Sequence, residues 1–298
     1  MHDMTGSTRA DSAKLQGERA SEAARPDVHA TQDGTGPHAS ASQPRSKTGP
    51  AIDFAAMPRF SPDPAVLDAN RVVAFDSRDI RSRPFNLMRT RFTKQLELQK
   101  MRLVGITSPA PTTGKSLLST NLAAAIARLK DSSVILADLD LRRGSIAETL
   151  GLPIERGITD YLDSKVEHID DLLIGIEGLP LAVLPTKVVS GDSTVLLSGD
   201  RYSKLMAWLR ARAQDTVVIV DLPPVFANDD TMILMESLDG YLMVVESGKT
   251  TAKQVKAAVE LLRPAVPLGS VLNRYQGGML DSYGYSGGGA AYSRYYDR

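Results

Sequence analysis

One short stretch, residues 109 to 116, limits the possible folds of this chain more than any other. It reads Pro-Ala-Pro-Thr-Thr-Gly-Lys-Ser, follows an apolar run at 102–107 and precedes a helix-compatible run at 117–129. This order of elements, a strand, then a tight turn ending in Gly-Lys-Ser, then a helix, is typical of loops that hold nucleotide phosphates. Backbone N–H groups and the helix N-terminus face the anion in such loops. Pro109 stands where the standard pattern has its first glycine. The predicted phosphate-contacting residues are Thr112, Thr113, Gly114, Lys115, Ser116 and Leu117.

After this loop, short apolar runs alternate with helical patterns. The expected strands are 102–107, 133–139, 181–184, 216–221, 241–246 and 267–272. The expected helices are 85–98, 115–129, 158–162, 201–212, 229–235 and 251–262. Fully apolar strands between helices indicate a parallel sheet that is covered on both faces. We therefore predict an α/β fold of the P-loop NTPase type, with a doubly wound, mainly parallel sheet. Ligands of such sheets bind beyond the carboxyl ends of the strands.

Acidic residues stand at the ends of two further strands. Asp138 and Asp140 follow the run at 134–137, and strand periodicity places both carboxylates on one face. Asp221 ends the β-branched run at 217–220 and precedes Leu-Pro-Pro. Solvated acids that end a strand are one explanation. Because these strands follow a phosphate-loop helix, we prefer a second one, a site for Mg²⁺ and a proton acceptor formed by Ser116, Asp138, Asp140 and Asp221.

Bulk composition excludes several classes of function. The 298 residues carry no formal net charge, which argues against a nucleic-acid binder. The chain has no cysteine, so disulfides and Cys-ligated iron–sulfur or zinc sites are impossible. No run approaches the roughly 18 consecutive apolar residues of a membrane span, and the N-terminus lacks the character of a signal peptide. A cytoplasmic protein is the expectation.

Composition also divides the chain into three parts. Residues 1–66 are rich in small and polar residues and are expected to be disordered, because they cannot bury enough apolar surface to offset their ordering entropy. Residues 67–274 form the predicted folded domain. Residues 275–298 are rich in glycine and tyrosine, and this tail is expected to be flexible.

The motifs in combination resemble those of the bacterial tyrosine autokinases (BY-kinases) of the CpsD/CapB type, which act in capsule and exopolysaccharide synthesis. Their phosphate loop typically reads Ser-Pro-x-Pro-Gly-Glu-Gly-Lys-Ser, and residues 108–116 fit it except at Thr112 and Thr113. The stretches 138–143 (Asp-Leu-Asp-Leu-Arg-Arg) and 221–225 (Asp-Leu-Pro-Pro-Val) also match. The similarity runs from about residue 85 to the C-terminus, about seven tenths of the chain.

The resemblance implies an ATP- and Mg²⁺-dependent protein-tyrosine kinase that phosphorylates its own tail and regulates exopolysaccharide chain synthesis and export. Lys115 would stabilise the transferring phosphoryl group, and Asp138 or, in our preference, Asp140 would accept the phenolic proton. Asn273 resembles the family's adenine-side asparagine, although a strand-end cap explains it equally well. The implied phosphoacceptors are Tyr283, Tyr285, Tyr292, Tyr295 and Tyr296.

The resemblance also implies partners. These are a membrane chain-length regulator that activates the kinase, a cognate phosphotyrosine phosphatase, and further copies of the chain in a homo-oligomer. The protein would then lie at the inner face of the plasma membrane through its activator, without binding nucleic acid. The family's Glu-x-x-Arg-x-x-Arg oligomerisation pattern is degraded here to Arg83, Asn86 and Arg89, so ring formation of the family type is in doubt.

Two alternative functions remain open on the sequence. ParA/MinD-type positioning ATPases share the fold, but they usually carry a second lysine early in the phosphate loop, where this chain has Pro109-Ala-Pro111. A catalytically weak, nucleotide-binding scaffold of the export machinery is the other alternative. It is suggested by the Thr112-Thr113 pair, which stiffens a turn that must wrap around phosphate.

Overall fold

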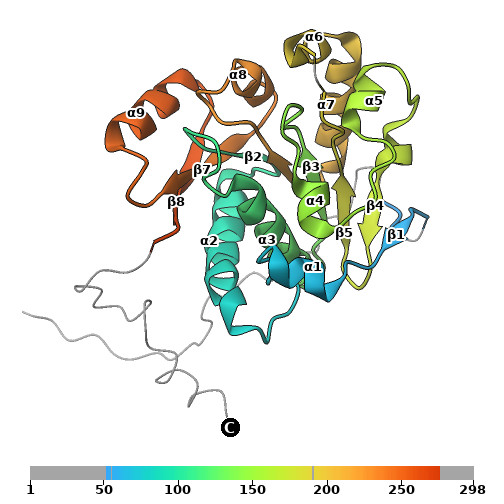
Figure 1. The fold of residues 1–298 in the computed structure, drawn as a ribbon, viewed down its shortest axis with the longest axis horizontal. Coiled ribbons are helices and arrows are strands. Elements are labelled where there is room, and N and C mark those ends of the chain that lie inside the picture. The colour runs from blue at the N-terminus through green and yellow to red at the C-terminus, as the bar shows by residue number, and fades with distance from the viewer. Residues whose placement is uncertain (1–51, 55, 190, 276–298) are drawn as a thin grey trace, which may run out of the picture. The chain divides into compact units, whose positions relative to one another are not determined.

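The computed structural model describes residues 52–54, 56–189 and 191–275 (Figure 1). The tail tyrosines from Tyr283 to Tyr296 lie outside these residues, as does the N-terminal stretch 1–51. The strands of the described part are β1 (Arg59–Phe60), β2 (Leu103–Thr107), β3 (Val134–Asp138), β4 (Ile174–Ile176), β5 (Leu181–Leu184), β6 (Val217–Asp221), β7 (Gly240–Glu246) and β8 (Pro267–Asn273).

Helices connect most of these strands. They are α1 (Pro64–Ala69), α2 (Arg83–Gln99), α3 (Lys115–Ala127), α4 (Ile146–Leu150), α5 (Ile158–Leu162), α6 (Ser193–Leu197), α7 (Asp200–Arg212), α8 (Asp230–Met235) and α9 (Ala252–Leu261). Two 3₁₀ turns, at Ile80–Ser82 and Ile169–Leu172, add to them. None of the helices in the described ranges has the length and apolar character needed to cross a lipid bilayer.

All of these strands join one sheet in the order β1-β4-β5-β3-β6-β2-β7-β8. Every pairing is parallel except that of β4 with β5. Strands β2, β3 and β6 are adjacent, and all their residues are buried, because helices cover both faces of the sheet. Their carboxyl ends, at Thr107, Asp138 and Asp221, therefore meet at one edge.

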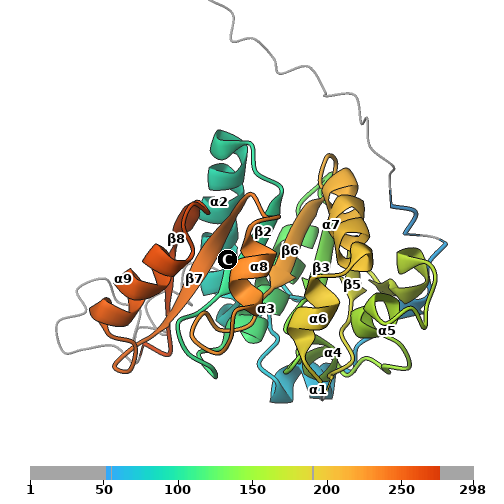
Figure 2. The ribbon, with the colours of Figure 1, turned by 90° about the horizontal axis from the view of Figure 1, so that it is seen from above.

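Each face of the sheet has its own apolar core, because alternate residues of a strand point to opposite sides. On one face, Val104, Ile106 and Leu136 pack with apolar side chains of α2, α3 and α4. Helix α3 is buried along nearly its whole length, because it lies between the sheet and its neighbours α2 and α4. These elements can be followed in Figures 1 and 2.

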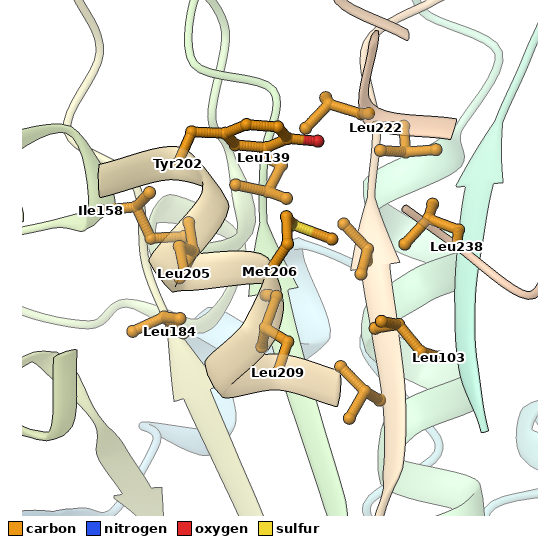
Figure 3. Packing of buried hydrophobic residues seen from close by; sticks show 14 of the residues in the cluster. Leu103, Leu139, Ile158, Leu184, Tyr202, Leu205, Met206, Leu209, Leu222 and Leu238 are labelled. Atoms are coloured by element: carbon orange, nitrogen blue, oxygen red, sulfur yellow. The ribbon is translucent and has the colours of Figure 1, made fainter. Parts of the chain in front are cut away.

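The opposite face is covered by α5, α7, α8 and α9. Side chains of α7, including Tyr202, Leu205 and Leu209, lie over strand residues such as Leu103 (Figure 3). Burial of one large aliphatic side chain contributes about 1.5–3 kcal/mol. The two cores together fix the sheet edge on which the site is built.

The predicted fold class is confirmed, and the predicted strands and helices are present with ends that differ by a few residues. Elements that the sequence analysis did not predict are β1, β4, α1, α4 and α6, all of six residues or fewer. The stretch 52–66, which the sequence analysis placed in the disordered segment, includes β1 and the start of α1. Strand β1 pairs with β4, so the ordered fold begins before the predicted boundary at residue 66. Such short elements depend on their pairing partners and carry no periodic signal.

Candidate nucleotide site

Hydrogen bonds between neighbouring strand ends fix the start of the phosphate loop. The Thr107 hydroxyl donates to the carbonyl oxygen of Pro223 at 2.8 Å, and the Val225 N–H donates to the carbonyl oxygen of Ser108 at 2.8 Å. These bonds join the end of β2 to the segment after β6. The Ser108 hydroxyl also donates to the Ala110 carbonyl oxygen, 2.7 Å away. The two loops are therefore held in a defined relative position.

Gly114 forms the turn into α3, and Asn273 holds it from the end of β8. Gly114 has φ +93°, a left-handed conformation that L side chains rarely adopt. A Cβ at this position would lie 2.2 Å from the Asn273 amide nitrogen. That amide donates to the Thr113 carbonyl oxygen at 2.7 Å. The glycine is thus required by the backbone conformation and by the close approach of Asn273.

Lys115 and Asp140 form a buried ion pair at this loop. The Lys115 Nζ lies 3.7 Å from the Asp140 Oδ2, and the two residues are 7% and 5% exposed. Burial raises the pKa of Asp140, and the Lys115 ammonium opposes this rise. The Asp140 carboxylate therefore takes up a proton more readily than an exposed one.

Asp221 accepts hydrogen bonds from two hydroxyl groups in the first turns of α3. Ser116 Oγ donates to its Oδ2 at 2.5 Å, and Ser119 Oγ donates to its Oδ1 at 2.8 Å. The side chain is fully buried. Burial raises the pKa of Asp221, against the opposing effects of Lys115 and the two hydroxyls. A buried carboxylate beside the phosphate-loop serine is the arrangement that holds Mg²⁺ in P-loop enzymes.

Asp138 has a different environment from the other two acids. Its Oδ1 accepts from the Asp140 N–H at 3.2 Å, and its Oδ2 accepts from the Ile146 N–H at 3.1 Å. Burial, and then the charge of Asp221, raise its pKa well above the ordinary value. Both oxygens thus organise the loop between β3 and α4, whereas Asp140 faces the lysine.

A cleft of about 310 Å³ opens at this edge of the sheet. Its lining residues are Pro111, Thr112, Gly114, Lys115, Ser116, Leu117, Asp140, Arg143, Ser145, Thr149, Pro224 and Arg274. Among the ionisable residues of this lining, three are cationic and Asp140 alone is acidic, a balance that favours a polyanionic ligand. A larger groove of about 600 Å³ lies between α2 and β8, but it contains none of the phosphate-loop residues.

Most of the predicted phosphate-loop residues line this cleft, whereas others support it. Thr113, Asp138, Asp221 and Asn273 are absent from the lining and act through hydrogen bonds to residues around it. The sequence analysis missed Arg274, Ser145, Thr149 and Pro224 as lining residues. Arg274 directly follows Asn273, and that adjacency is the one signal that the sequence offered for it.

The two arginines after Asp140 take different directions. Arg143 lines the cleft, and its backbone N–H donates to the Asp140 Oδ1 at 3.1 Å. The Arg142 Nε donates to the Ser193 hydroxyl at 2.7 Å and lies 3.6 Å from the buried Asp230 Oδ2. Arg142 therefore connects this loop to α6 and α8, and Arg143 contributes charge to the cleft.

The oxygen donors of the site fit Mg²⁺. The serine hydroxyl and carboxylates are hard ligands of the kind that this ion prefers. In the described part of the chain, no group of three or more His, Cys, Asp or Glu residues is arranged to hold a metal by itself. A P-loop site does not require one, because Mg²⁺ keeps several waters and uses one or two protein ligands with the substrate phosphates.

Comparisons with known proteins show relatives among tyrosine-protein kinases. No protein-family profile matches the chain. A tyrosine-protein kinase of Acinetobacter johnsonii, ptk, is 30% identical over 190 residues, which are 64% of this chain and 25% of that protein. The tyrosine-protein kinase YwqD of Bacillus subtilis is 29% identical over 223 residues, 74% of this chain and 92% of that one.

Solved structures show the same relationship. The kinase domain of the Escherichia coli tyrosine kinase Etk aligns with a TM-score of 0.59 and 26% identity, over 78% of this chain and 82% of that domain. A ParA-family ATPase from Chlorobium tepidum shares the fold, with a TM-score of 0.50 and 20% identity over 60% of this chain and 76% of that one.

The fold and the cleft define a P-loop α/β protein with a candidate nucleotide-phosphate site. The comparisons then identify the chain as a homologue of the bacterial tyrosine-protein kinases, with the fold of their kinase domain. The chain spans about a quarter of the length of the Acinetobacter relative and nearly all of YwqD.

Proposed function

We propose that the chain is an ATP- and Mg²⁺-dependent protein-tyrosine kinase that phosphorylates its own C-terminal tyrosines, Tyr283, Tyr285, Tyr292, Tyr295 and Tyr296. The observation that carries this proposal is the buried pair of Lys115 and Asp140 at the phosphate-loop cleft, next to the Ser116–Asp221 hydrogen bond. These contacts support a cation for the phosphates, a proton acceptor and a pair of magnesium ligands at one edge of the sheet.

The proposed reaction follows from these contacts. The phenolic oxygen of a tyrosine attacks the γ-phosphorus of ATP, a new O–P bond forms, and the bond to the ADP oxygen breaks. Lys115 neutralises charge on the transferring oxygens, and Asp140 takes the phenolic proton. Mg²⁺, held by Ser116 and Asp221 with the phosphates, would supply further charge neutralisation. The raised pKa of Asp140 suits proton transfer, because an acceptor works best when its pKa is near the working pH.

The finer biological role rests on the family resemblance. We infer that the kinase regulates exopolysaccharide or capsule chain synthesis and export, with a membrane chain-length regulator as activator and a phosphotyrosine phosphatase as antagonist. The protein would then act at the inner face of the plasma membrane. Each phosphate adds about −1.5 to −2 charges, so a multiply phosphorylated tail repels acidic surfaces and favours dissociation of an assembly.

The degraded oligomerisation pattern lies on α2. The Arg89 guanidinium donates to the Ala125 carbonyl oxygen at 3.3 Å, and Arg128 donates to the Asn86 side-chain oxygen. Asn86 and Arg89 are therefore engaged with the α3 region of the same chain. A homo-oligomer of this chain is therefore expected to differ from the family ring.

Incubation of the full chain with Mg·ATP, with and without a candidate activator, tests the kinase proposal. Intact mass and peptide mapping should find phosphate on residues 283–296. The Lys115→Met variant should abolish it, and Lys130→Met, at an exposed lysine after α3, should not. ATP hydrolysis without any protein phosphorylation would instead indicate a positioning ATPase.

One observation favours a second candidate function, a nucleotide-binding scaffold with weak catalysis. Thr112 has φ +59°, a conformation that is strained for a β-branched residue, in the loop that must surround the phosphates. Binding of ATP without turnover, with or without the activator, would support the scaffold and contradict the kinase.

A further inference from the structure

Arg274 is a charged residue of the cleft to which neither the sequence motifs nor the proposed reaction assigns a role. It follows β8 directly, and its side chain lines the same cleft as Gly114, Lys115 and Ser116. Half of the side chain is exposed, so the guanidinium is accessible to a ligand in the cleft.

The local charge balance leaves the positive charge of Arg274 available. The Glu246 Oε1 lies 2.9 Å from the Arg274 Nη1 and 2.8 Å from the Lys249 Nζ. One carboxylate oxygen is thus shared by two cations, which leaves one positive charge without a counterion in this cluster. Lys249 alone suffices to neutralise Glu246, and it does not line the cleft. The charge available to a ligand is therefore that of Arg274.

The backbone of Arg274 is fixed relative to the phosphate loop. Its N–H donates to the Asn273 Oδ1 at 2.9 Å, while the Asn273 Nδ2 donates to the Thr113 carbonyl oxygen. Arg274 has φ +57°, a left-handed conformation that costs energy for a non-glycine residue and is often found at ligand-binding positions. Asn273 therefore places the arginine at a set distance from the loop that holds the phosphates.

On these grounds we propose that Arg274 is a phosphate-binding residue of the nucleotide site, a second cation beside Lys115. A guanidinium offers two parallel N–H donors to a phosphate group and is always charged. The ligand class is a nucleoside di- or triphosphate. The inference deepens the proposed function and rests on it for the identity of the ligand.

Direct titration of the full chain with fluorescent mant-ATP and Mg²⁺ tests this inference independently of phosphate transfer. Arg274→Gln should raise the Kd about tenfold, the loss expected for a charge-assisted hydrogen bond. Arg274→Lys should retain part of the affinity, because it keeps the charge but not the paired donors. Lys130→Gln is the control, since Lys130 is exposed and does not line the cleft, and its Kd should stay within about twofold of the unmodified chain.

Glu246→Gln separates ligand binding from a structural role of the ion pair. If Arg274 binds phosphate, this variant should bind mant-ATP as tightly as the unmodified chain or more tightly, because the competing carboxylate is gone. Equal weakening by Arg274→Gln and Glu246→Gln would show that the pair is only structural and would overturn the inference. An unchanged Kd for Arg274→Gln would overturn it as well. If Arg274→Gln leaves the Kd unchanged while Lys115→Met still weakens binding, the proposed function survives without the Arg274 contact. If the unmodified chain does not bind mant-ATP, the Arg274 inference and the proposed function both fail.

Discussion

Replacing Gly114 by alanine is expected to destabilise the protein by about 2–3 kcal/mol, from two separable causes. The first is the positive φ of +93°, which costs an L residue about 1–2 kcal/mol. The second is the contact of the new Cβ with the Asn273 amide nitrogen, 2.2 Å away. That amide must move, and its 2.7 Å hydrogen bond to the Thr113 carbonyl oxygen is then lost, at about 1 kcal/mol.

A double-mutant cycle separates the two causes. Asn273→Ala alone should cost about 1 kcal/mol, because the same hydrogen bond is lost. The double variant Gly114→Ala/Asn273→Ala should cost no more than Gly114→Ala alone, since the clash and the bond disappear together. Gly178→Ala is the matched control: Gly178 has φ +77°, but its Cβ would meet nothing within 4 Å, so only the backbone cost of about 1–2 kcal/mol applies.

The assay is urea unfolding followed by the fluorescence of Trp208, the only tryptophan of the chain, with linear extrapolation to water. Two results would refute the reasoning. One is equal destabilisation by Gly114→Ala and Gly178→Ala, which would mean that Asn273 adds nothing. The other is strictly additive costs in the double variant, which would mean that the two side chains do not compete for one space.

Three further outcomes concern the reacting groups. Thr112→Gly should raise the phosphorylation rate. The free energy of unfolding of this variant should change by less than about 1 kcal/mol, because the relieved strain is offset by the backbone entropy of glycine. A slower phosphorylation rate would contradict the strain argument. Asp140→Asn should lower the phosphorylation rate at least about 100-fold while the Kd for ATP changes little, and Asp131→Asn, at an exposed turn, should change neither. Asp221→Asn should raise the melting temperature at neutral pH without nucleotide. The folded state binds the Asp221 proton more tightly than the unfolded state, so the stability of the unmodified chain falls as pH rises from the ordinary carboxylate range through the raised pKa. The higher melting temperature of Asp221→Asn should therefore disappear on acidification. A difference in melting temperature that stays constant across pH, measured by thermal unfolding, would contradict this reasoning.

Much of the site was predictable because its main parts are local in sequence. The Gly-Lys-Ser turn follows β2 directly, and Asp138 and Asp221 end β3 and β6. In a parallel sheet the carboxyl ends of neighbouring strands share one edge, so strand assignment alone brings these groups together. The expected gathering of the lysine, the serine and the acids at one edge followed from that rule. The pairing of Lys115 with Asp140, and of Ser116 with Asp221, is seen only in the structure.

The different tasks of the acids were not predictable in the same way. Asp138 and Asp140 are two residues apart on one face of the chain, yet both Asp138 oxygens accept backbone N–H groups, whereas one Asp140 oxygen faces Lys115. Likewise, Arg142 contacts Ser193, whereas its neighbour Arg143 lines the cleft. Such choices depend on how the loop after β3 folds, and residue type and spacing do not determine that.

The sequence alone determined the alternation of apolar runs and helices, the phosphate loop and the acids at the strand ends. Each of these features depends on residues that are close together in the chain. Tertiary structure alone decided that β8 lies next to β7 and near the loop, so that Asn273 bonds to a carbonyl oxygen 160 residues earlier and Arg274 joins the cleft. Strand order determines these contacts through packing between distant segments, and packing of that kind leaves no periodic pattern in the sequence.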